Sequence, residues 1–179
     1  VTALRRLGFS DVMEVALGAD VTSQREAAEF VERMERGDTF MTTSCCPAYV
    51  EAVRRHAPEL LPHVSETATP MHYTAEIARE RHPDTVTVFI GPCVAKRQEG
   101  LHDEMVDYVL TFEEVGALFN ALGAGDNDGI RPHGQITQLL RYGTHGYGRH
   151  HHHDQFRIFH QVQITSGMNV GSQGSGGFR

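Results

Sequence analysis

Over the first two thirds of the chain, segments in which apolar residues follow a helical period alternate with segments that follow a strand pattern. Helices are predicted where apolar residues recur every three or four positions, and strands where β-branched and apolar residues run together. The expected helices cover 2–7, 23–37, a segment from Pro47, 70–77 and 111–122, and the expected strands cover 12–17, 39–43, 85–90 and 106–110. Strands alternating with helices indicate parallel βαβ units and the α/β fold class.

Capping residues support two of these helix boundaries. Ser23 and Glu26 form one capping box, and Thr111 and Glu114 form another. Gly37 suits the end of the 23–37 helix. The apolar stripe of that helix, at helical spacing, consists of Ala27, Phe30, Val31 and Met34.

The pattern changes near Gly123. Twelve of the 18 glycines and seven of the 12 histidines, including His150–His153, lie from there to the end. A short helix over 135–142 is the one element expected there, and residues 171–179 are typical of a Gly/Ser tail. We therefore divide the chain into an α/β part, 1–122, and a Gly/His-rich, irregular C-terminal segment, 123–179, which we expect to pack poorly.

Charge and hydropathy exclude two kinds of partner. The formal net charge of −7 argues against nucleic acid, because phosphate binding needs a basic face. No run approaches the ~18–20 apolar residues of a membrane span, and the first residues do not form a signal peptide. We expect a cytoplasmic protein without a membrane partner, and because residue 1 is Val, we expect the true N-terminus to be missing.

The chain has three cysteines, each in a loop after a predicted strand. Cys45 and Cys46 follow the 39–43 strand, and Cys93 follows the 85–90 strand. Ligands of parallel sheets bind beyond the carboxyl ends of the strands, so these loops can converge on one site. Lys96, three residues beyond Cys93, could hold an anion there.

Plainer explanations exist for the same residues. The cysteines could be a buried pair near a helix start, and Lys96 could belong to a solvated basic corner. Glu26 and Glu29 lie on one face of a helix, where carboxylates are usually solvated. The run His150–His153 could bind a divalent metal loosely, but is more typical of a solvated tail.

Two motifs carry a resemblance to a known family. Residues 43–49 are TSCCPAY and residues 91–97 are GPCVAKR. They resemble the TSCCPxW and PCxAK motifs of the [FeFe]-hydrogenases, in the same order and at a similar separation. The resemblance extends over about residues 1–121.

The resemblance implies roles for individual residues. Cys46 and Cys93 resemble two thiolate ligands of a [4Fe-4S] cubane, and Cys45 resembles the thiol that passes protons to a di-iron subcluster. Lys96 resembles the donor to a cyanide ligand on iron. The resemblance also implies a proton path behind Cys45, formed by Glu26, Glu29, Ser65 and Arg33. It further implies that Thr69 and Pro92 belong to the cofactor pocket.

The implied cofactor is the H-cluster, which joins the cubane and the di-iron subcluster. The implied partners are molecular hydrogen, protons, an electron carrier such as ferredoxin, and maturation proteins. No cysteine follows Cys93, so the third motif, with its C-x3-C pair, is missing and the ligand set is incomplete. A fragment, a frame shift near Gly123 or a decayed gene would each explain this. We favour a fragment or a frame shift, and we expect the chain to be inactive alone.

Three functions compete at this stage. The first is an oxidoreductase that interconverts protons and hydrogen, or a hydrogen sensor. The sensor is included because the residues at Thr69, Met71 and Gly91 resemble those of a divergent subgroup with sensory members. The second is a hydrogenase-like iron-sulfur assembly or scaffold protein, which would need neither Lys96 nor the Cys45–Cys46 pair. The third is a thiol enzyme with Cys45 as nucleophile and His72 as its base.

Overall fold

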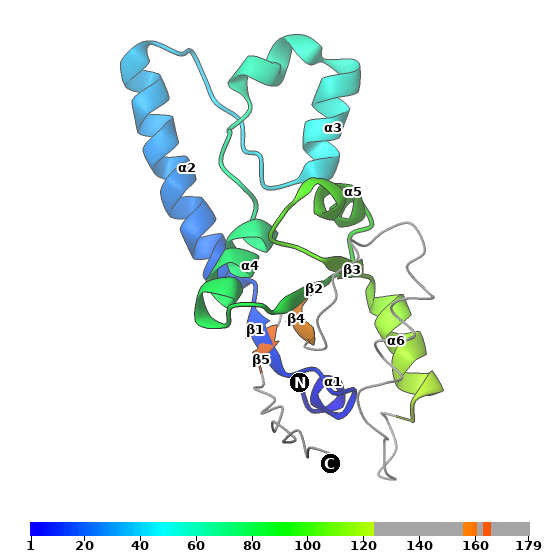
Figure 1. Ribbon diagram of the computed structural model, residues 1–179. Helices are drawn as coiled ribbons and strands as arrows, with labels where there is room; N and C mark the ends of the chain where they lie inside the picture. Colours follow the sequence, from blue (N-terminus) through cyan, green and yellow to red (C-terminus); the bar gives the residue numbers. More distant parts are fainter. Residues whose placement is uncertain (124–155, 161–162, 166–179) are drawn as a thin grey trace, which may run out of the picture.

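A sheet of five strands with helices on both faces forms the body of the protein (Figure 1). The computed structural model describes residues 1–123, 156–160 and 163–165. The helices are α1 (Thr2–Arg6), α2 (Ala16–Arg36), α3 (Pro47–His56), the 3-10 helix η1 (Pro58–His63), α4 (Pro70–Arg81), α5 (Ala95–His102) and α6 (Phe112–Ala121). The strands are β1 (Asp11–Glu14), β2 (Val86–Ile90), β3 (Tyr108–Leu110), β4 (Phe156–His160) and β5 (Gln163–Thr165).

The strand order is β1-β5-β4-β2-β3, and β1 also pairs with β4. β2 runs parallel to β3 and to β4, β4 runs parallel to β1, and β5 is antiparallel to both of its neighbours. The predicted α/β class with parallel units is therefore confirmed. The tail was expected to contain no strand, and this is wrong for 156–160 and 163–165. The 135–142 helix, the 171–179 tail and the run His150–His153 lie outside the described residues.

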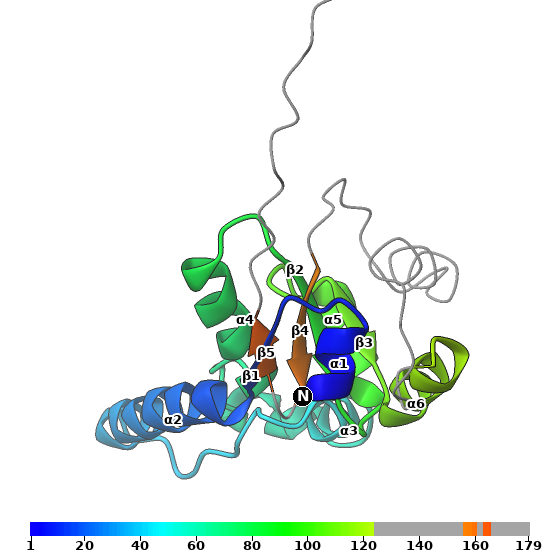
Figure 2. The same ribbon diagram turned by 90° about the horizontal axis from the view of Figure 1, so that it is seen from below.

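The two faces of the sheet bury separate apolar clusters. Successive strand side chains point to opposite faces. Val88 and Ile90 of β2 therefore join the cluster of α1 and α6, whereas Phe89 joins the cluster of α4. Figure 2 shows α4 on one side of the sheet and α1 and α6 on the other. Full burial explains why β2 is an uninterrupted apolar and β-branched run.

Helix α2 begins seven residues before the predicted start at Ser23. β1 ends at Glu14, so the predicted strand to residue 17 is too long, and Ser23 is an exposed residue inside the helix. The real packing face contains Gly18 and Thr22, and the Thr22 hydroxyl donates back to the Gly18 carbonyl at 3.0 Å. The predicted apolar stripe is largely exposed among the described residues, with Phe30 at 46%.

The segment 39–43 is not a strand of the sheet. It forms one isolated parallel bridge, Thr42 to Val64, in which Thr42 N donates to His63 O (2.7 Å) and Ser65 N donates to Thr42 O (2.8 Å). Cys45 and Cys46 therefore do not follow a sheet strand, which corrects that expectation, whereas Cys93 does follow β2. The bridge joins two loops that connect helices. The β-branched run at 39–43 predicts an extended segment, but it does not show that the segment pairs with another loop.

Capping chemistry explains the boundaries that the sequence placed well. Pro47 and Pro70 occupy the first turns of α3 and α4, where a missing N–H costs nothing. Thr111 and Glu114 form the predicted capping box of α6. Helix α5 was not predicted as an element, and it places Lys96 in its first turn. Among the described residues, no helix has the length and hydropathy needed to cross a membrane.

Candidate active site

A cavity of about 420 Å³ lies where β1 and β2 end and α2, α4 and α5 begin. Ligands of parallel sheets bind in such positions. The wall is mostly apolar, and its two chemically reactive side chains are Cys45 and Lys96. The full lining consists of Val15, Ala16, Ala19, Cys45, Pro70, Met71, Phe89 and Lys96. The structure thus brings together a thiol and an ammonium that are 51 positions apart in the sequence.

Lys96 is held by a carboxylate from its own helix. Its Nζ lies 2.7 Å from Glu99 Oε2, and the two side chains are only 12% and 15% exposed. Thr69 donates its hydroxyl proton to the other oxygen, Oε1, of Glu99. Sequence reasoning missed Glu99, although a carboxylate three positions after a lysine on one helix is a recognisable pair. This pairing fixes the position of the ammonium at the cavity wall.

The three thiols stand at exposed positions near helix starts. Cys46 is the N-cap of α3, and Cys93 lies two residues before α5, where its carbonyl accepts from Lys96 N at 3.2 Å. Helices α3 and α5 contact each other. The N-terminal ends of helices favour negative charge, which suits thiolate ligands of a metal centre. The sequence offers two such thiolates besides Cys45, half the number that normally hold a cubane.

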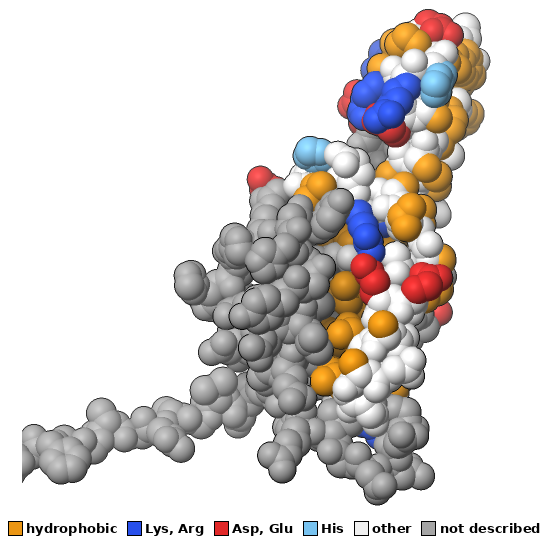
Figure 3. All heavy atoms as spheres, turned by 90° about the vertical axis from the view of Figure 1, so that its right-hand side faces the viewer, with side chains coloured by type: hydrophobic (Ala, Val, Ile, Leu, Met, Phe, Trp, Pro, Cys, Tyr) orange, Lys and Arg blue, Asp and Glu red, His pale blue; other side chains and the backbone are white. Residues whose placement is uncertain are grey.

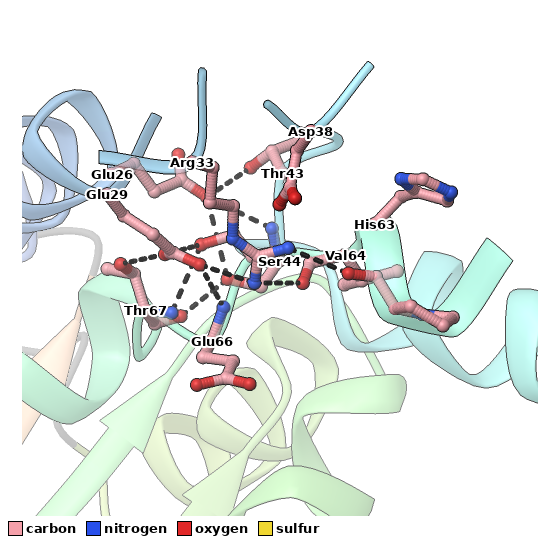
Figure 4. Close-up of polar contacts among 12 residues, drawn as sticks. Glu26, Glu29, Arg33, Asp38, Thr43, Ser44, His63, Val64, Glu66 and Thr67 are labelled. Carbon is pink, nitrogen blue, oxygen red and sulfur yellow. Dashed lines mark hydrogen bonds and ion pairs between the residues drawn. The ribbon is translucent and has the colours of Figure 1, made fainter. Parts of the chain in front are cut away.

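Glu26 of α2 holds the loop that leads into Cys45 (Figure 4). Its Oε1 accepts from the Thr43 hydroxyl (2.7 Å) and from Ser44 N (3.0 Å). The Thr43 hydroxyl oxygen in turn accepts from Cys45 N at 3.3 Å. A carboxylate therefore stands one hydroxyl away from the backbone of the reactive thiol.

Glu29 lies one helical turn further along α2, and both of its carboxylate oxygens accept hydrogen bonds. Its Oε2 accepts from the hydroxyls of Ser65 (2.6 Å) and Thr67 (2.8 Å), and its Oε1 accepts from Glu66 N (3.0 Å) and pairs with Arg33 (2.7 Å). Burial alone would raise the pKa of Glu29, but these donors outweigh it and lower the pKa from 4.5 to about 2. Thr67 is a site residue that sequence reasoning missed.

Arg33 connects this carboxylate to the end of η1 and to the loop after it. It is buried, and its guanidinium donates to the carbonyls of Pro62 (2.8 Å) and Val64 (3.0 Å) as well as to Glu29. A planar guanidinium has enough donors to satisfy all three acceptors at once. The loop from 62 to 67 is therefore fastened to α2 at the same place as Glu29.

Glu26 and Glu29 belong to one polar cluster. Besides its link to Glu26, Ser44 donates its hydroxyl proton to the Thr67 carbonyl at 2.5 Å, while the Thr67 hydroxyl reaches Glu29. The predicted residues Glu26, Glu29 and Ser65 thus lie in one connected set of contacts, through two residues that were not predicted.

His72 is not placed to act as a base for the Cys45 thiol. Its Nδ1 lies 3.0 and 3.1 Å from the two carboxylate oxygens of Asp103, and it lines a different cavity from Cys45. The hydrogen bond to Asp103 raises the pKa of His72, despite partial burial. The thiol-enzyme hypothesis therefore loses its candidate base.

A glutamate and two arginines form ion pairs on the exposed face of α3. Glu51 pairs with both Arg54 (2.6 Å) and Arg55 (2.5 Å). Figure 3 shows basic and acidic side chains next to each other at the top of the molecule. Exposed pairs of this kind contribute little stability.

Comparison with known proteins agrees with this fold. Residues 1–131 match the family described as iron only hydrogenase large subunit, C-terminal domain. The chain is 32% identical over 164 residues to the periplasmic [Fe] hydrogenase large subunit of Nitratidesulfovibrio vulgaris, covering 82% of this chain and 38% of that protein. The structure of apo [FeFe]-hydrogenase HydA1 from Chlamydomonas reinhardtii superimposes with a TM-score of 0.62 at 31% identity, over 71% of this chain and 37% of that one.

The fold and the comparisons define a hydrogenase-like iron-sulfur protein. The chain belongs to the family of iron-only hydrogenase large subunits. It spans 38% of the length of the Nitratidesulfovibrio protein. It is also 26% identical, over 62% of its length and 24% of the relative, to the cytosolic Fe-S cluster assembly factor NAR1 of Kluyveromyces lactis.

Proposed function

We propose that this chain supplies the Cys45–Lys96 half of a site that interconverts protons and molecular hydrogen, or senses hydrogen, at an H-cluster. The observation that carries the proposal is the shared apolar cavity of Cys45 and Lys96 at the carboxyl ends of β1 and β2. A cavity with one thiol, one ammonium and a mostly apolar wall suits an anionic cofactor.

The residues present fit part of that cofactor. Cys46 and Cys93, at the starts of the contacting helices α3 and α5, would supply two thiolates to the cubane. Lys96, pinned by Glu99, would donate to an anionic ligand of the di-iron subcluster. Thr69 and Pro92 complete the proposed pocket, because Thr69 fixes Glu99 and Pro92 precedes Cys93. When bound, the cluster supplies the iron chemistry and the electrons.

The chain's own residues would move protons towards that cavity. In our proposal Cys45 is the inner proton donor and acceptor, and Glu26, joined to the loop before it, serves as the next carboxylate. Ser65 and Glu29 continue the path outward, and Arg33 holds Glu29 in place. With a pKa of about 2, Glu29 stays ionised near neutral pH. In our proposal it therefore carries a proton only transiently, and between transfers it orients the Ser65 and Thr67 hydroxyls.

The partners follow from this chemistry. Hydrogen and protons would be the substrates, an electron carrier such as ferredoxin would supply or accept electrons, and maturation proteins would deliver the cluster. A cytoplasmic location belongs to the same proposal. A relative at 32% identity is periplasmic by name, so fractionation of the native host would decide the location.

Assembly of iron-sulfur clusters is the second candidate function, because NAR1 of Kluyveromyces lactis is also a relative. A scaffold that carries cubanes has no need for an ammonium donor in an apolar cavity. The Lys96–Glu99 pair at the Cys45 cavity therefore favours hydrogen chemistry.

A chimera tests the choice between the two functions. Residues 1–122 would replace the equivalent region of the Nitratidesulfovibrio subunit, and the chimera would be matured with its cluster. We expect hydrogen evolution, and we expect Cys45→Ala to lower it by about 10²–10⁴-fold with iron content unchanged, the usual range for losing a proton-transfer group. Full iron content without hydrogen turnover would favour the scaffold function.

A further inference from the structure

The ring of Phe89 occupies the place where a side chain at position 91 would lie. Phe89 belongs to β2 and joins the apolar cluster on the α4 face of the sheet. Residues two positions apart in an extended chain point to the same face, so a side chain at position 91 would point the same way. A Cβ added at Gly91 would lie 2.7 Å from Cε1 and 2.9 Å from Cζ of Phe89. The far end of the ring therefore covers the Gly91 backbone.

The backbone of Gly91 gives no other reason for a glycine at this position. Among the described residues, the glycines with a positive φ are Gly8, Gly37 and Gly123, so Gly91 has a conformation that residues with side chains also adopt. Its N–H donates to Leu110 O of β3 at 3.0 Å, which fixes this backbone to the sheet. If position 91 had a side chain, the ring rather than the backbone would therefore have to move.

The same ring forms part of the wall of the cavity that contains Cys45 and Lys96. That cavity measures about 420 Å³, and Phe89 lines it although its side chain is only 4% exposed. Phe89 also belongs to a buried cluster that includes Ala75 and Ala78 of α4, which are 0% and 1% exposed. Close-packed interiors yield little, so a displaced ring would move towards the open cavity.

We propose that Phe89 determines how much room this cavity offers its occupant, and that Gly91 is the positioning residue that lets the ring lie beside the cavity instead of inside it. The inference deepens the proposed function and rests on it for the identity of the occupant, which is the anionic di-iron part of the cluster. The geometric part concerns the chain without a cluster and can be tested there.

The volume that the ring controls is a substantial part of the cavity. A cavity of about 150 Å³ accommodates benzene, so a phenyl ring that turned fully inward would fill roughly a third of the 420 Å³. The remaining space would fall to about the lower end of the roughly 300–1,000 Å³ that ligand pockets measure. Even one methyl group at position 91 requires the ring to move by about 1 Å to restore ordinary contact.

A purely structural role is the competing explanation, because crowding at any buried position lowers stability. Gly100 of α5 provides the matched control for crowding. A Cβ at Gly100 would lie 2.7 Å from Cγ2 of Val109, the same distance as at Gly91, but Val109 does not line the cavity. Gly100→Ala therefore introduces a similar clash without moving the Phe89 ring.

Xenon binding measures the open volume of the cavity in the chain alone, because xenon enters apolar cavities. NMR detects the binding at the methyl groups of Ala16 and Ala19, which line the cavity. We expect Gly91→Ala to weaken xenon binding there about threefold or more, and Gly100→Ala to change it by less than about twofold. Adding Phe89→Leu to the Gly91→Ala chain should restore the binding, because the intruding ring is then absent.

Three results would overturn the inference, whatever happens to the melting temperature. The first is an unchanged xenon affinity in Gly91→Ala, and the second is a loss of affinity that Phe89→Leu does not reverse. The third is an absence of xenon binding at Ala16 and Ala19 in the unchanged chain.

The matured chimera tests the consequence for the cofactor. Gly91→Ala should remove most of the cyanide and carbonyl infrared bands of the di-iron part while the iron of the cubane is retained, and Phe89→Leu should restore those bands. Unchanged bands in Gly91→Ala would overturn the role of Phe89 in admitting the cofactor. If xenon binding follows the expected order and the unsubstituted chimera never carries these bands, the proposed function fails and the effect of Phe89 on the cavity stands.

Discussion

Ser65 donates its hydroxyl proton to Glu29 Oε2 at 2.6 Å, although the two residues are 36 positions apart. This contact fastens the 62–67 loop to α2, together with the bonds from Thr67, Glu66 N and Arg33 to the same carboxylate. The charge state of Glu29 and the stability of this part of the protein are therefore linked.

The first prediction concerns the pH dependence of stability. The folded pKa of Glu29 is lowered from 4.5 to about 2, so its stabilising effect is fully present above pH ~4.5 and is lost as the pH falls towards 2. That shift corresponds to at most about 3 kcal/mol. Glu29→Gln should therefore lower the free energy of unfolding at pH 7 by about 1–3 kcal/mol, and the difference should shrink between pH 4.5 and 2. Urea unfolding at several pH values measures it.

Glu32→Gln is the control for this measurement. Glu32 is exposed on the same helix, so its replacement should change stability by less than about 0.5 kcal/mol at any of these pH values. A pH-independent loss in Glu29→Gln would show that the carboxylate is not ionised in the way described.

The second prediction concerns the crossing of α2 and α4. A Cβ at Gly18 would lie 2.1 Å from the Thr74 hydroxyl and 2.2 Å from the Pro70 carbonyl. The backbone oxygen cannot move without shifting α4, so Gly18→Ala should destabilise the protein by about 1–3 kcal/mol. Thermal unfolding followed by circular dichroism measures this change.

A second glycine provides the opposite case. A Cβ added at Gly116, inside α6, would meet no described atom within 4 Å beyond its chain neighbours and the backbone of its own helix. Gly116→Ala should therefore stabilise the protein by about 0.5–1 kcal/mol, because alanine favours the helix. Similar effects at both positions would contradict the close approach of α2 and α4.

The third prediction concerns Lys96 in the matured chimera. Lys96→Met should remove the proposed ammonium donor while keeping the length of the side chain. We expect loss of most di-iron subcluster, seen as loss of the cyanide and carbonyl bands in the infrared spectrum, with the cubane retained. Arg97→Met, next along α5, should keep those bands. An unchanged infrared spectrum in Lys96→Met would remove Lys96 from the site.

The fourth prediction concerns the 179-residue chain alone. Supplied with iron, sulfide and the maturation proteins, it should show no hydrogen turnover, because Cys46 and Cys93 provide two of the four thiolates that a cubane normally needs. Any bound iron should be released readily to a chelator. Stable binding of four or more irons with hydrogen evolution would contradict this prediction and would require other ligands in the chain.

The sequence alone determined the elements whose signals are local. The fully apolar run of β2 requires burial on both faces, and the capping box at Thr111 satisfies the first N–H groups of α6 whatever surrounds it. The two cysteine motifs are equally local, and they identified the family that the comparisons confirm.

Tertiary structure decided the features that depend on distant partners. Ser23 does not begin α2, because the helix already starts at Ala16. Gly18 lies in this added first part, where the absence of a side chain lets α2 approach α4 closely. Residues 39–43 pair with the loop at Val64, and β4 takes its place between β1 and β2 from more than 60 residues beyond β2. Only folding brings Thr67 to Glu29, Glu99 to Thr69 and Asp103 to His72, because hydrogen bonds between distant segments leave no periodic trace in the sequence.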